Sequence, residues 1–489
     1  MLLSELLKSA EIEYNGNDCE IDDVVCDSRE AREGTVFVCI AGFVSDGHAY
    51  AVRAYDMGCR VFVAERELDL PSDAIVIMQE NTRIALAGLC AAIHDFPARK
   101  LKVIGITGTK GKTTTSLMIA SVLNKNGIPT GYIGSNGVDF GGNHFETANT
   151  TPDSLTLHRY FADMLEAGME AVVLEVSSQA IYLDRVHGIS FYATAFTNLA
   201  PDHIGGNEHP TFEHYRDTKK RLFDEYFSAN VFYNADEADS GYMMSGLKTV
   251  PHSFGVDKGE LRACGIAPFM QDGELGISFT AYDANEKCSV KLPMPGAFNV
   301  SNALCAISIA ESLGVSLENI AAALGDAYAS GRFEIVKTNL PAVFVIDYAH
   351  NGYSLTSALT TLRKYSPNRL FCVVGSVGGR TKGRRAELGE AASRLADVVV
   401  LTSDNPDFED PIDICNEMKA AFVKDVQHEI FADRADAVKY VIDNVQKDDI
   451  VLFAGKGHEQ YQFVRGGKIP FSERKLIETY AAEMSAELV

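Results

Sequence analysis

The sequence predicts an α/β protein of three domains: a small N-terminal α/β domain, a central parallel-sheet domain with a phosphate-binding loop, and a C-terminal Rossmann-like domain. The length of 489 residues suggests three domains at about 150 residues each. Apolar runs alternate with helix-like segments, which favours mostly parallel sheets covered by helices. Changes in pattern place the boundaries, and we expect domains over residues 1–99, 100–332 and 333–489.

Charge and composition exclude several functional classes. The formal net charge of −23 argues against a general nucleic-acid-binding protein. No apolar run is long enough to span a bilayer, and residues 1–10 resemble an amphipathic helix more than a signal peptide. Ten cysteines are scattered without metal-ligand spacing, which is typical of reduced thiols in the cytoplasm. We therefore expect a cytoplasmic monomer without nucleic-acid or membrane partners.

The first domain is expected to carry binding groups in two loops. Short apolar segments and helices near residues 49–58 and 82–95 predict a small α/β domain. Asp27-Ser28-Arg29 and Asp46-Gly47-His48 follow or interrupt apolar runs, where loops often bind ligands. Ordinary surface turns explain these two motifs about as well.

A phosphate-binding loop is predicted at the start of the central domain. The apolar run 101–106 ends in Thr107-Gly108-Thr109-Lys110-Gly111-Lys112-Thr113, and a helix-like segment follows. Glycines let backbone N–H groups face an anion, and the helix N-terminus adds partial positive charge. In such a loop Lys112 reaches the terminal phosphates and the Thr113 hydroxyl ligates Mg²⁺. Position 106 is Ile instead of the usual glycine, so a turn that only packs a helix on a sheet is the alternative.

Two further positions in this domain are candidate cation ligands. Glu175 ends the buried-type strand 169–176, and an acid at a strand end beside a phosphate loop is typical of a Mg²⁺ ligand. A glutamate reaching solvent at the sheet edge is the other interpretation. His203 follows the next strand in Asp202-His203 and could ligate a second cation, although a single histidine is often structural.

The last domain repeats the alternation of strands and helices. Four apolar runs are each followed at once by a polar or glycine cluster, and ligands of open parallel sheets bind beyond the carboxyl ends of the strands. We therefore expect one face of this domain to be a binding face. The four clusters are Asp347–Asn351, Gly375–Arg380, Thr402–Asp407 and Ala454–Glu459.

The chain resembles the Mur ligase family over all three predicted domains, and most closely its MurE-type branch. The resemblance is carried, in the family's order, by Gly108–Thr115, Asn149–Pro152, Glu175–Ser178, Phe196–Asn198, Asp202-His203, Gly331–Glu334, Asp347–Asn351, Asp404–Pro406 and Gly455–Glu459. It implies an ATP-dependent ligase that adds the third stem-peptide residue to UDP-N-acetylmuramoyl-L-alanyl-D-glutamate, through an acyl phosphate that the incoming amine attacks. Folylpolyglutamate synthase and a non-catalytic nucleotide-binding partner remain alternatives.

The resemblance also implies residue roles. Catalytic positions are Lys112, His203, Lys219, Asp347 and His350, and Thr113, Glu175, His203 and Lys219 would hold Mg²⁺, with Lys219 as a carbamate. ATP would be bound by Gly108, Thr109, Lys110, Gly111, Lys112, Thr113, Thr114, Asn299 and Arg332. The other substrates would be bound by Ser28, Asp46, Gly47, His48, Asn149, Thr150, Thr151, Ser177, Arg185, Arg385, Asp404, Asn405, Asp407, Gly455 and Glu459.

One departure from the family pattern bears on the choice of amino acid. Relatives that add diaminopimelate have Asp-Asn-Pro-Arg, whereas this chain has Asp404-Asn405-Pro406-Asp407. An acidic loop repels a distal carboxylate and attracts a distal ammonium. We therefore expect L-lysine as the added residue, with meso-diaminopimelate and ornithine as alternatives. If diaminopimelate is used, Arg384 or Arg385 would have to receive its distal carboxylate.

Overall fold

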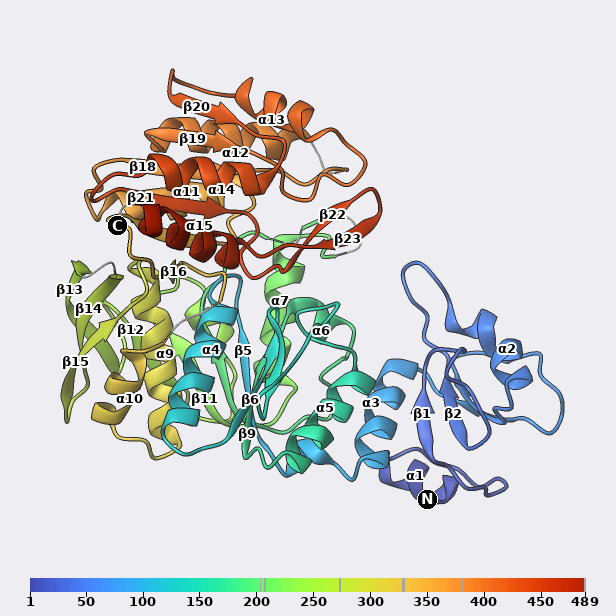
Figure 1. Cartoon of the computed structure of the whole chain (residues 1–489). Helices are drawn as coiled ribbons and strands as arrows, with labels where there is room; N and C mark the ends of the chain where they lie inside the picture. Colours follow the sequence, from blue (N-terminus) through green and yellow to red (C-terminus); the bar gives the residue numbers. More distant parts are fainter. Residues whose placement is uncertain (203, 206–207, 272–273, 328–329, 380–381, 488–489) are drawn as a thin grey trace. The chain divides into compact units, whose positions relative to one another are not determined.

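The computed structural model describes residues 1–202, 204–205, 208–271, 274–327, 330–379 and 382–487, apart from a few side chains at the edges of these ranges (Figure 1). It forms two compact units: Met1–Arg262 with Leu304–Ser316, and Ala263–Ala303 with Leu317–Val489. The predicted α/β class is confirmed, whereas the predicted domain boundaries stay predictions. Among the described residues, no helix has both the length and the apolar character needed to cross a bilayer.

The first unit begins with a four-stranded sheet in the order β1-β2-β3-β4, and all of its pairings are parallel. Leu3, Leu6, Val36 and Val63 belong to the apolar core on one face of this sheet. Because the strands are parallel, their carboxyl ends and the loops that follow lie at one edge. The elements are α1 (Leu3–Ser9), β1 (Asp23–Val25), β2 (Thr35–Val38), η1 (Gly47–Tyr50), α2 (Ala51–Asp56), β3 (Val61–Ala64), β4 (Ile75–Met78), α3 (Thr82–Ile93) and η2 (Pro97–Arg99).

The larger sheet of the first unit has β5 between its parallel neighbours β9 and β10 (Figure 1). Its strand order within the unit is β12-β11-β10-β5-β9-β6-β7-β8. The pairs β6–β7 and β7–β8 are antiparallel, and the other pairings in this order are parallel. The strands are β5 (Lys102–Thr107), β6 (Thr130–Gly134), β7 (Gly137–Phe140), β8 (Asn143–Phe145), β9 (Ala171–Glu175), β10 (Phe191–Phe196), β11 (Ser228–Asn234) and β12 (His252–Gly255). The helices are α4 (Lys112–Lys125), α5 (Ser154–Glu166), α6 (Ser178–Tyr182), α7 (Phe212–Asp224) and α8 (Ser240–Met243).

The second unit contains a six-stranded sheet in the order β16-β17-β21-β18-β19-β20, parallel except for the short edge strand β16. Two separate apolar cores line its two faces, one with α11, α12 and α13 and the other with α14 and α15. This is the doubly wound arrangement that places loops at the carboxyl ends of the strands. The strands are β16 (Glu334–Val336), β17 (Val343–Asp347), β18 (Leu370–Val374), β19 (Val398–Leu401), β20 (Gln427–Ile430) and β21 (Ile450–Ala454).

The helices of this sheet are α11 (Gly352–Arg363), α12 (Lys382–Leu395), α13 (Pro411–Lys419), α14 (Arg434–Asn444) and α15 (Glu473–Glu487). The remaining strands include the antiparallel pairs β14–β15 and β22–β23. They are β13 (Leu261–Gln271), β14 (Glu274–Tyr282), β15 (Lys287–Leu292), β22 (Tyr461–Val464) and β23 (Gly467–Pro470). The helices α9 (Phe298–Ser312) and α10 (Leu317–Leu324) precede the six-stranded sheet in the chain.

Candidate active site

The predicted phosphate loop connects β5 to α4, as its sequence requires. Gly108 and Gly111 have φ angles of +152° and +81°, which side chains disfavour, and a Cβ on Gly108 would collide with the Thr197 hydroxyl. The α4 helix begins at Lys112, whose Nζ donates to the carbonyls of Gly108 (2.9 Å) and Thr109 (3.1 Å). The Lys112 side chain therefore folds back over the loop at the N-terminus of α4, where the helix dipole stabilises an anion.

Glu175 ends β9 beside this loop, and its carboxylate is fully buried. It accepts hydrogen bonds from Thr113 Oγ1 (3.0 Å), Tyr132 Oη (2.6 Å) and the Ser135 N–H (3.0 Å). A buried carboxylate and a hydroxyl in contact are oxygen donors of the kind that Mg²⁺ prefers. The residues present therefore fit the expected magnesium site, and the interpretation of Glu175 as a solvent-facing edge residue is wrong.

Lys219 lies on α7 with 1% of its surface exposed, and its Nζ donates to the Gly108 carbonyl at 3.0 Å. Burial lowers the pKa of this ammonium well below its usual value, and the nearby charge of Lys112 adds to the lowering. The Tyr215 ring centroid lies 4.8 Å from Nζ, and Tyr215 Oη is 3.0 Å from Thr109 Oγ1. Lys219 thus lies under the phosphate loop as an amine biased toward its neutral form.

Other predicted nucleotide residues lie around the same loop. Asn198 accepts from the Lys110 N–H (2.8 Å) and donates to its carbonyl (2.9 Å), which fixes the peptide on both sides. The Lys110 ammonium contacts Asp202 at 3.0 Å, and Thr114 is buried at the start of α4. His203, the predicted second cation ligand, lies outside the described residues.

Several residues predicted to bind the acceptor lie next to the Glu175 main chain and to Ser135. Thr151 Oγ1 donates to the Glu175 carbonyl (2.7 Å) and accepts from the Ser177 N–H (3.0 Å). Arg185 donates to the Thr151 carbonyl at 2.8 Å. Thr150 is hydrogen-bonded to Ser135 at 2.9 Å, whereas Asn149 is exposed. The end of β9 therefore joins the magnesium candidate to the predicted acceptor residues.

The N-terminal motif Asp46-Gly47-His48 is held by hydrogen bonds within the protein. The His48 ring is buried, and Nε2 accepts from the Glu65 N–H at 3.0 Å, so Nδ1 carries the hydrogen that it donates to Asp46 Oδ1 (2.7 Å). Gly47 lies too close to the Ile40 backbone to carry a Cβ. Both ring nitrogens of His48 are thus occupied within the protein, while Ser28 is buried at the carboxyl end of β1.

In the second unit, Asp347 at the end of β17 accepts from the Phe333 N–H at 2.8 Å. Burial raises the pKa of Asp347 to about 6, although the Arg332 guanidinium opposes the shift. Arg332 lies 4.9 Å from the Tyr348 ring centroid, and His350 Nδ1 lies 2.8 Å from the Tyr348 carbonyl oxygen. The structure therefore brings Arg332, Asp347 and His350 together.

Asn299, another predicted nucleotide residue, is buried near the start of α9. Its amide nitrogen donates to the Pro295 carbonyl at 2.8 Å, and its oxygen accepts from Asn302 Nδ2 at 2.9 Å. Both ends of the amide are thus used inside the second unit. These two hydrogen bonds order the turn before α9 and use one of the two donors and one of the two acceptor positions of the amide, so its role toward the nucleotide stays a prediction.

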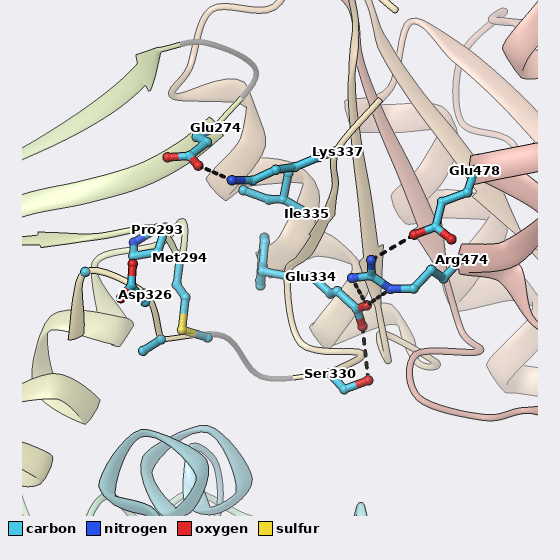
Figure 2. A pocket seen from close by; sticks show the side chains of 13 residues that line it. Glu274, Pro293, Met294, Asp326, Ser330, Glu334, Ile335, Lys337, Arg474 and Glu478 are labelled. Carbon is cyan, nitrogen blue, oxygen red and sulfur yellow. Dashed lines mark hydrogen bonds and ion pairs between the residues drawn. The ribbon is translucent and has the colours of Figure 1, made fainter. Parts of the chain in front are cut away.

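The turn before Arg332 borders a pocket of about 560 Å³ in the second unit. Figure 2 shows that Glu334 accepts from Ser330 and from Arg474 Nε (3.2 and 2.6 Å), while Lys337 is paired with Glu274. Two ion pairs between different segments, Glu334–Arg474 and Glu274–Lys337, thus line the pocket. Glu334 consequently orders the segment that presents Arg332, and these pairings give no independent indication of a ligand.

The loops after β19 and β21 are joined by a buried charge network. Lys456 Nζ donates to Asn405 Oδ1 (2.9 Å) and Glu459 Oε2 (2.6 Å) and lies 3.7 Å from Asp404. Asn405 also donates to Glu459 at 3.0 Å. Gly455, with φ +106°, allows the turn that brings these groups together. Lys456 was not among the predicted site residues, although it lies inside a motif that was.

Asp407 and Arg385 both have structural partners. Asp407 adopts a left-handed φ of +53°, and its carboxylate accepts from the Gly466 N–H at 2.7 Å, which ties the loop to the β22–β23 hairpin. Arg385 is almost fully buried and donates to Glu409 (2.8 and 2.9 Å) and to Glu417 (2.8 Å). Of the two arginines considered for a distal carboxylate, Arg385 is therefore already engaged by two carboxylates.

Comparisons with known proteins agree with this arrangement. The model of the Mur ligase middle domain matches residues 106–310, and that of the Mur ligase glutamate ligase domain matches residues 331–457. A UDP-N-acetylmuramoyl-L-alanyl-D-glutamate–2,6-diaminopimelate ligase of Clostridium botulinum is 36% identical over 492 residues, 99% of this chain and 100% of the relative. The chain belongs to the Mur ligase family.

Further relatives have the same name. The ligase of Geobacillus kaustophilus is 36% identical over 480 residues, 96% of each chain. A solved structure of a ligase with this name has a TM-score of 0.74 at 26% identity and covers 98% of this chain and 99% of its own. The predicted family is confirmed, and this chain is an ATP-dependent ligase that forms a carbon–nitrogen bond. L-lysine as the added residue is not supported, because the names favour the diaminopimelate alternative.

The buried Asp347 of this Mur ligase predicts a pH-dependent stability. Its raised pKa, about 6 against 3.8 in the unfolded chain, means that the native state keeps a proton that the unfolded state has released. Stability should fall as pH rises from about 4 to about 6, by a contribution on the order of 3 kcal/mol. Asp347→Asn should remove this contribution and raise the unfolding temperature above pH 6. Thermal unfolding between pH 3.5 and 8 measures it, with exposed Asp436→Asn as control. Curves for Asp347→Asn and wild type that run parallel between pH 4 and 6 would contradict it.

Proposed function

We propose that the chain joins meso-diaminopimelate to UDP-N-acetylmuramoyl-L-alanyl-D-glutamate, using ATP and Mg²⁺ and passing through an acyl phosphate. The observation that carries the proposal is the group around Glu175, where the phosphate loop, a Mg²⁺-type oxygen pair and the predicted acceptor residues meet at one strand end. ATP transfers its terminal phosphoryl group to the acceptor's free carboxylate. The amine of the amino acid then attacks the acyl carbon, and phosphate leaves.

The first unit supplies the groups that phosphoryl transfer needs. Lys112 and the N–H groups of the loop neutralise the phosphates, and Thr113 with Glu175 would hold Mg²⁺. When bound, Mg²⁺ supplies charge stabilisation at the phosphate oxygens. Thr151, Ser177 and Arg185 lie next to Glu175, so they can hold the acceptor while its carboxylate is activated.

Diaminopimelate is favoured because the relatives that match nearly the whole chain are named for it. Its distal end carries an ammonium as well as a carboxylate, so the acidic Asp407 loop does not exclude it. Arg384 is the arginine that can receive the carboxylate, because Arg385 is engaged by Glu409 and Glu417. Burial lowers the pKa of His350, and the charge of Arg384 adds to this lowering. L-lysine is the second candidate, supported by Asp407 at the position where diaminopimelate-adding relatives have arginine.

A substrate panel tests the proposal. Purified enzyme is given ATP, Mg²⁺ and the UDP-muramoyl dipeptide with meso-diaminopimelate, L-lysine or L-ornithine, and product mass and kcat/KM are measured. We expect diaminopimelate to be preferred. Loss of a charged contact costs about 1.5–3 kcal/mol, so Arg384→Ala should lower kcat/KM for diaminopimelate about tenfold or more with little effect on lysine.

Arg394→Ala is the matched control, since Arg394 is an exposed arginine of the same helix paired with Glu390. It should leave the preference unchanged. A preference for L-lysine would contradict the proposed amino acid and favour the second candidate. Phosphate release that needs neither acceptor nor amino acid would contradict the ligase reaction as proposed.

We also propose that Lys219 is carbamylated in the working enzyme. A neutral amine attacks CO₂, and the lowered pKa of the buried Lys219 favours that form. The carbamate would be an anion beside Lys112 and the proposed magnesium site. It would replace the positive charge of Lys219 by a negative charge that attracts the Lys112 ammonium and Mg²⁺. The carbamate therefore relieves the repulsion between two lysines that contact the same Gly108 carbonyl.

Lys219→Ala should therefore nearly abolish ligation, and short carboxylic acids should restore part of it by occupying the vacated space. Lys220→Ala, on the same helix and paired with Asp224, is the control and should stay active. Initial rates with and without added acetate or propionate measure the effect. Full activity of Lys219→Ala would contradict the proposed carbamylation. Wild-type activity that is unchanged after thorough removal of CO₂ and bicarbonate would also contradict it.

A further inference from the structure

Arg434, the first residue of α14, is fully buried, and it was not among the residues predicted from the sequence. Its guanidinium donates from Nε (2.7 Å) and Nη2 (3.2 Å) to the carboxylate of Glu473, the first residue of α15. Removing two opposite charges from water costs free energy that largely cancels their attraction, so a buried ion pair alone is a weak source of stability. The role of Arg434 is therefore better indicated by the remaining contacts of its guanidinium.

These remaining contacts join two loops that are predicted to bind the amino acid. Arg434 Nη1 donates to the Ser403 carbonyl (3.3 Å), and Nη2 donates to the Ala454 carbonyl (2.9 Å). Ser403 follows β19, and Ala454 ends β21. The next residues along the chain are Asp404 and Gly455, both predicted to bind a substrate. One buried side chain thus holds the backbone of both loops directly before their predicted ligands.

The strands that carry these loops are not neighbours, because β18 lies between β19 and β21 (Figure 1). Adjacent strands are about 4.8 Å apart, so the two strand ends are separated by roughly 10 Å. A Cβ on Gly375, directly after β18, would lie 2.4 Å from the Thr402 carbonyl oxygen and 2.9 Å from the Asp404 nitrogen. A Cβ on Gly455 would lie 2.9 Å from Asp404 Oδ2. The loop after β19 therefore passes over the end of β18 and reaches the loop after β21.

Arg434 also acts on the charge of Asp404. Burial raises the pKa of this buried carboxyl, and the charges of Lys456 and Arg434 oppose the rise. The carboxylate form is the one that best accepts hydrogen bonds from an ammonium, which diaminopimelate and L-lysine both carry at the distal end. Arg434 therefore favours both the position and the charged form of a predicted ligand.

We propose that Arg434 is a positioning residue for the incoming amino acid and that it sets the distance between the loops after β19 and β21. The inference rests on the proposed function and deepens it by naming a residue that controls amino acid affinity without touching the substrate. Direct contact is excluded because the exposed fraction of Arg434 is 0%. A displacement of about 1 Å in a substrate-holding group is enough to lower a rate strongly. A planar guanidinium suits this task because its N–H groups keep fixed directions, whereas a lysine ammonium presents all of its donors from one nitrogen.

The test compares Arg434→Lys with the wild type. Lysine keeps the charge beside Glu473 but replaces three guanidinium nitrogens by one, so the two loops should lose part of their connection. KM is measured for meso-diaminopimelate, or for L-lysine if the wild type prefers it, and for the UDP-muramoyl dipeptide and ATP. We expect the amino acid KM to rise about tenfold or more and the other two KM values to stay unchanged. A role limited to stability would instead lower the unfolding temperature and leave all three KM values unchanged.

Arg434→Met combined with Glu473→Leu is the second variant. Removing both charges together leaves no unpaired buried charge, so this variant should fold even if Arg434→Lys does not. It also lacks the contacts with Ser403 and Ala454, and it should therefore show a rise in amino acid KM of at least the same size. Unfolding temperatures of all variants show how much stability each one has lost.

Arg369→Lys is the matched control. Arg369 directly precedes β18 and pairs at 2.6 Å with the buried Asp449, which directly precedes β21 at the opposite edge of the same sheet. Arg369 also donates to the Asn444 carbonyl at 2.9 Å, so the control disturbs the same kinds of contact. It should leave all three KM values unchanged.

An unchanged amino acid KM in both Arg434 variants would overturn the inference while leaving the ligase function intact. An equal rise in Arg369→Lys would also overturn it, because any loosening of the sheet would then be enough to weaken binding. A wild type that forms no product from the UDP-muramoyl dipeptide with any of the amino acids would overturn the proposed function itself.

Discussion

The buried carboxylate of Glu175 is the interaction on which the first unit's site depends. Burying a charged carboxylate costs several kcal/mol unless hydrogen bonds replace its water. Here Thr113, Tyr132 and Ser135 supply donors from the start of α4, from β6 and from the turn after β6. The Glu175 main chain in turn accepts from Thr151. One residue at a strand end thus fixes the phosphate loop relative to the predicted acceptor residues.

Lysines at the phosphate loop explain how an acidic protein can bind anionic phosphates. Lys112 and Lys219 both donate to the Gly108 carbonyl. Each cation is fixed by a hydrogen bond to a backbone carbonyl or a carboxylate. The net charge of −23 therefore describes the rest of the surface, while local cations decide which ligands bind.

The parts of the site that could be predicted from sequence are those encoded locally. The glycine loop, the strand before it and the helix after it are neighbours in the chain, so their pattern predicted the loop at Gly108–Thr113. Glu175 could be selected because an acid ending an apolar strand is a local signal. Lys219 depended on resemblance to a family, since nothing in its own helix shows that the side chain is buried.

The rest depended on contacts between residues far apart in the chain. The His48 ring is hydrogen-bonded to the Glu65 N–H and to Asp46, contacts that no local pattern shows, and its role toward the substrate stays a prediction. Lys456 was missed because its partner Asn405 is 51 residues away. The expectation of L-lysine rested on the charge of Asp407, whereas the structure shows this side chain fixed by the Gly466 N–H.

The most direct measurement of the central claim is the affinity for ADP with and without Mg²⁺, determined by calorimetry in the wild type and in Glu175→Gln. If Glu175 and Thr113 hold the metal of the nucleotide, the wild type binds ADP more tightly with Mg²⁺ than without it. In Glu175→Gln this gain in affinity should be smaller by about tenfold. Glu170→Gln, exposed just before the start of β9, keeps it. An equal magnesium effect in the wild type and in Glu175→Gln would contradict the account.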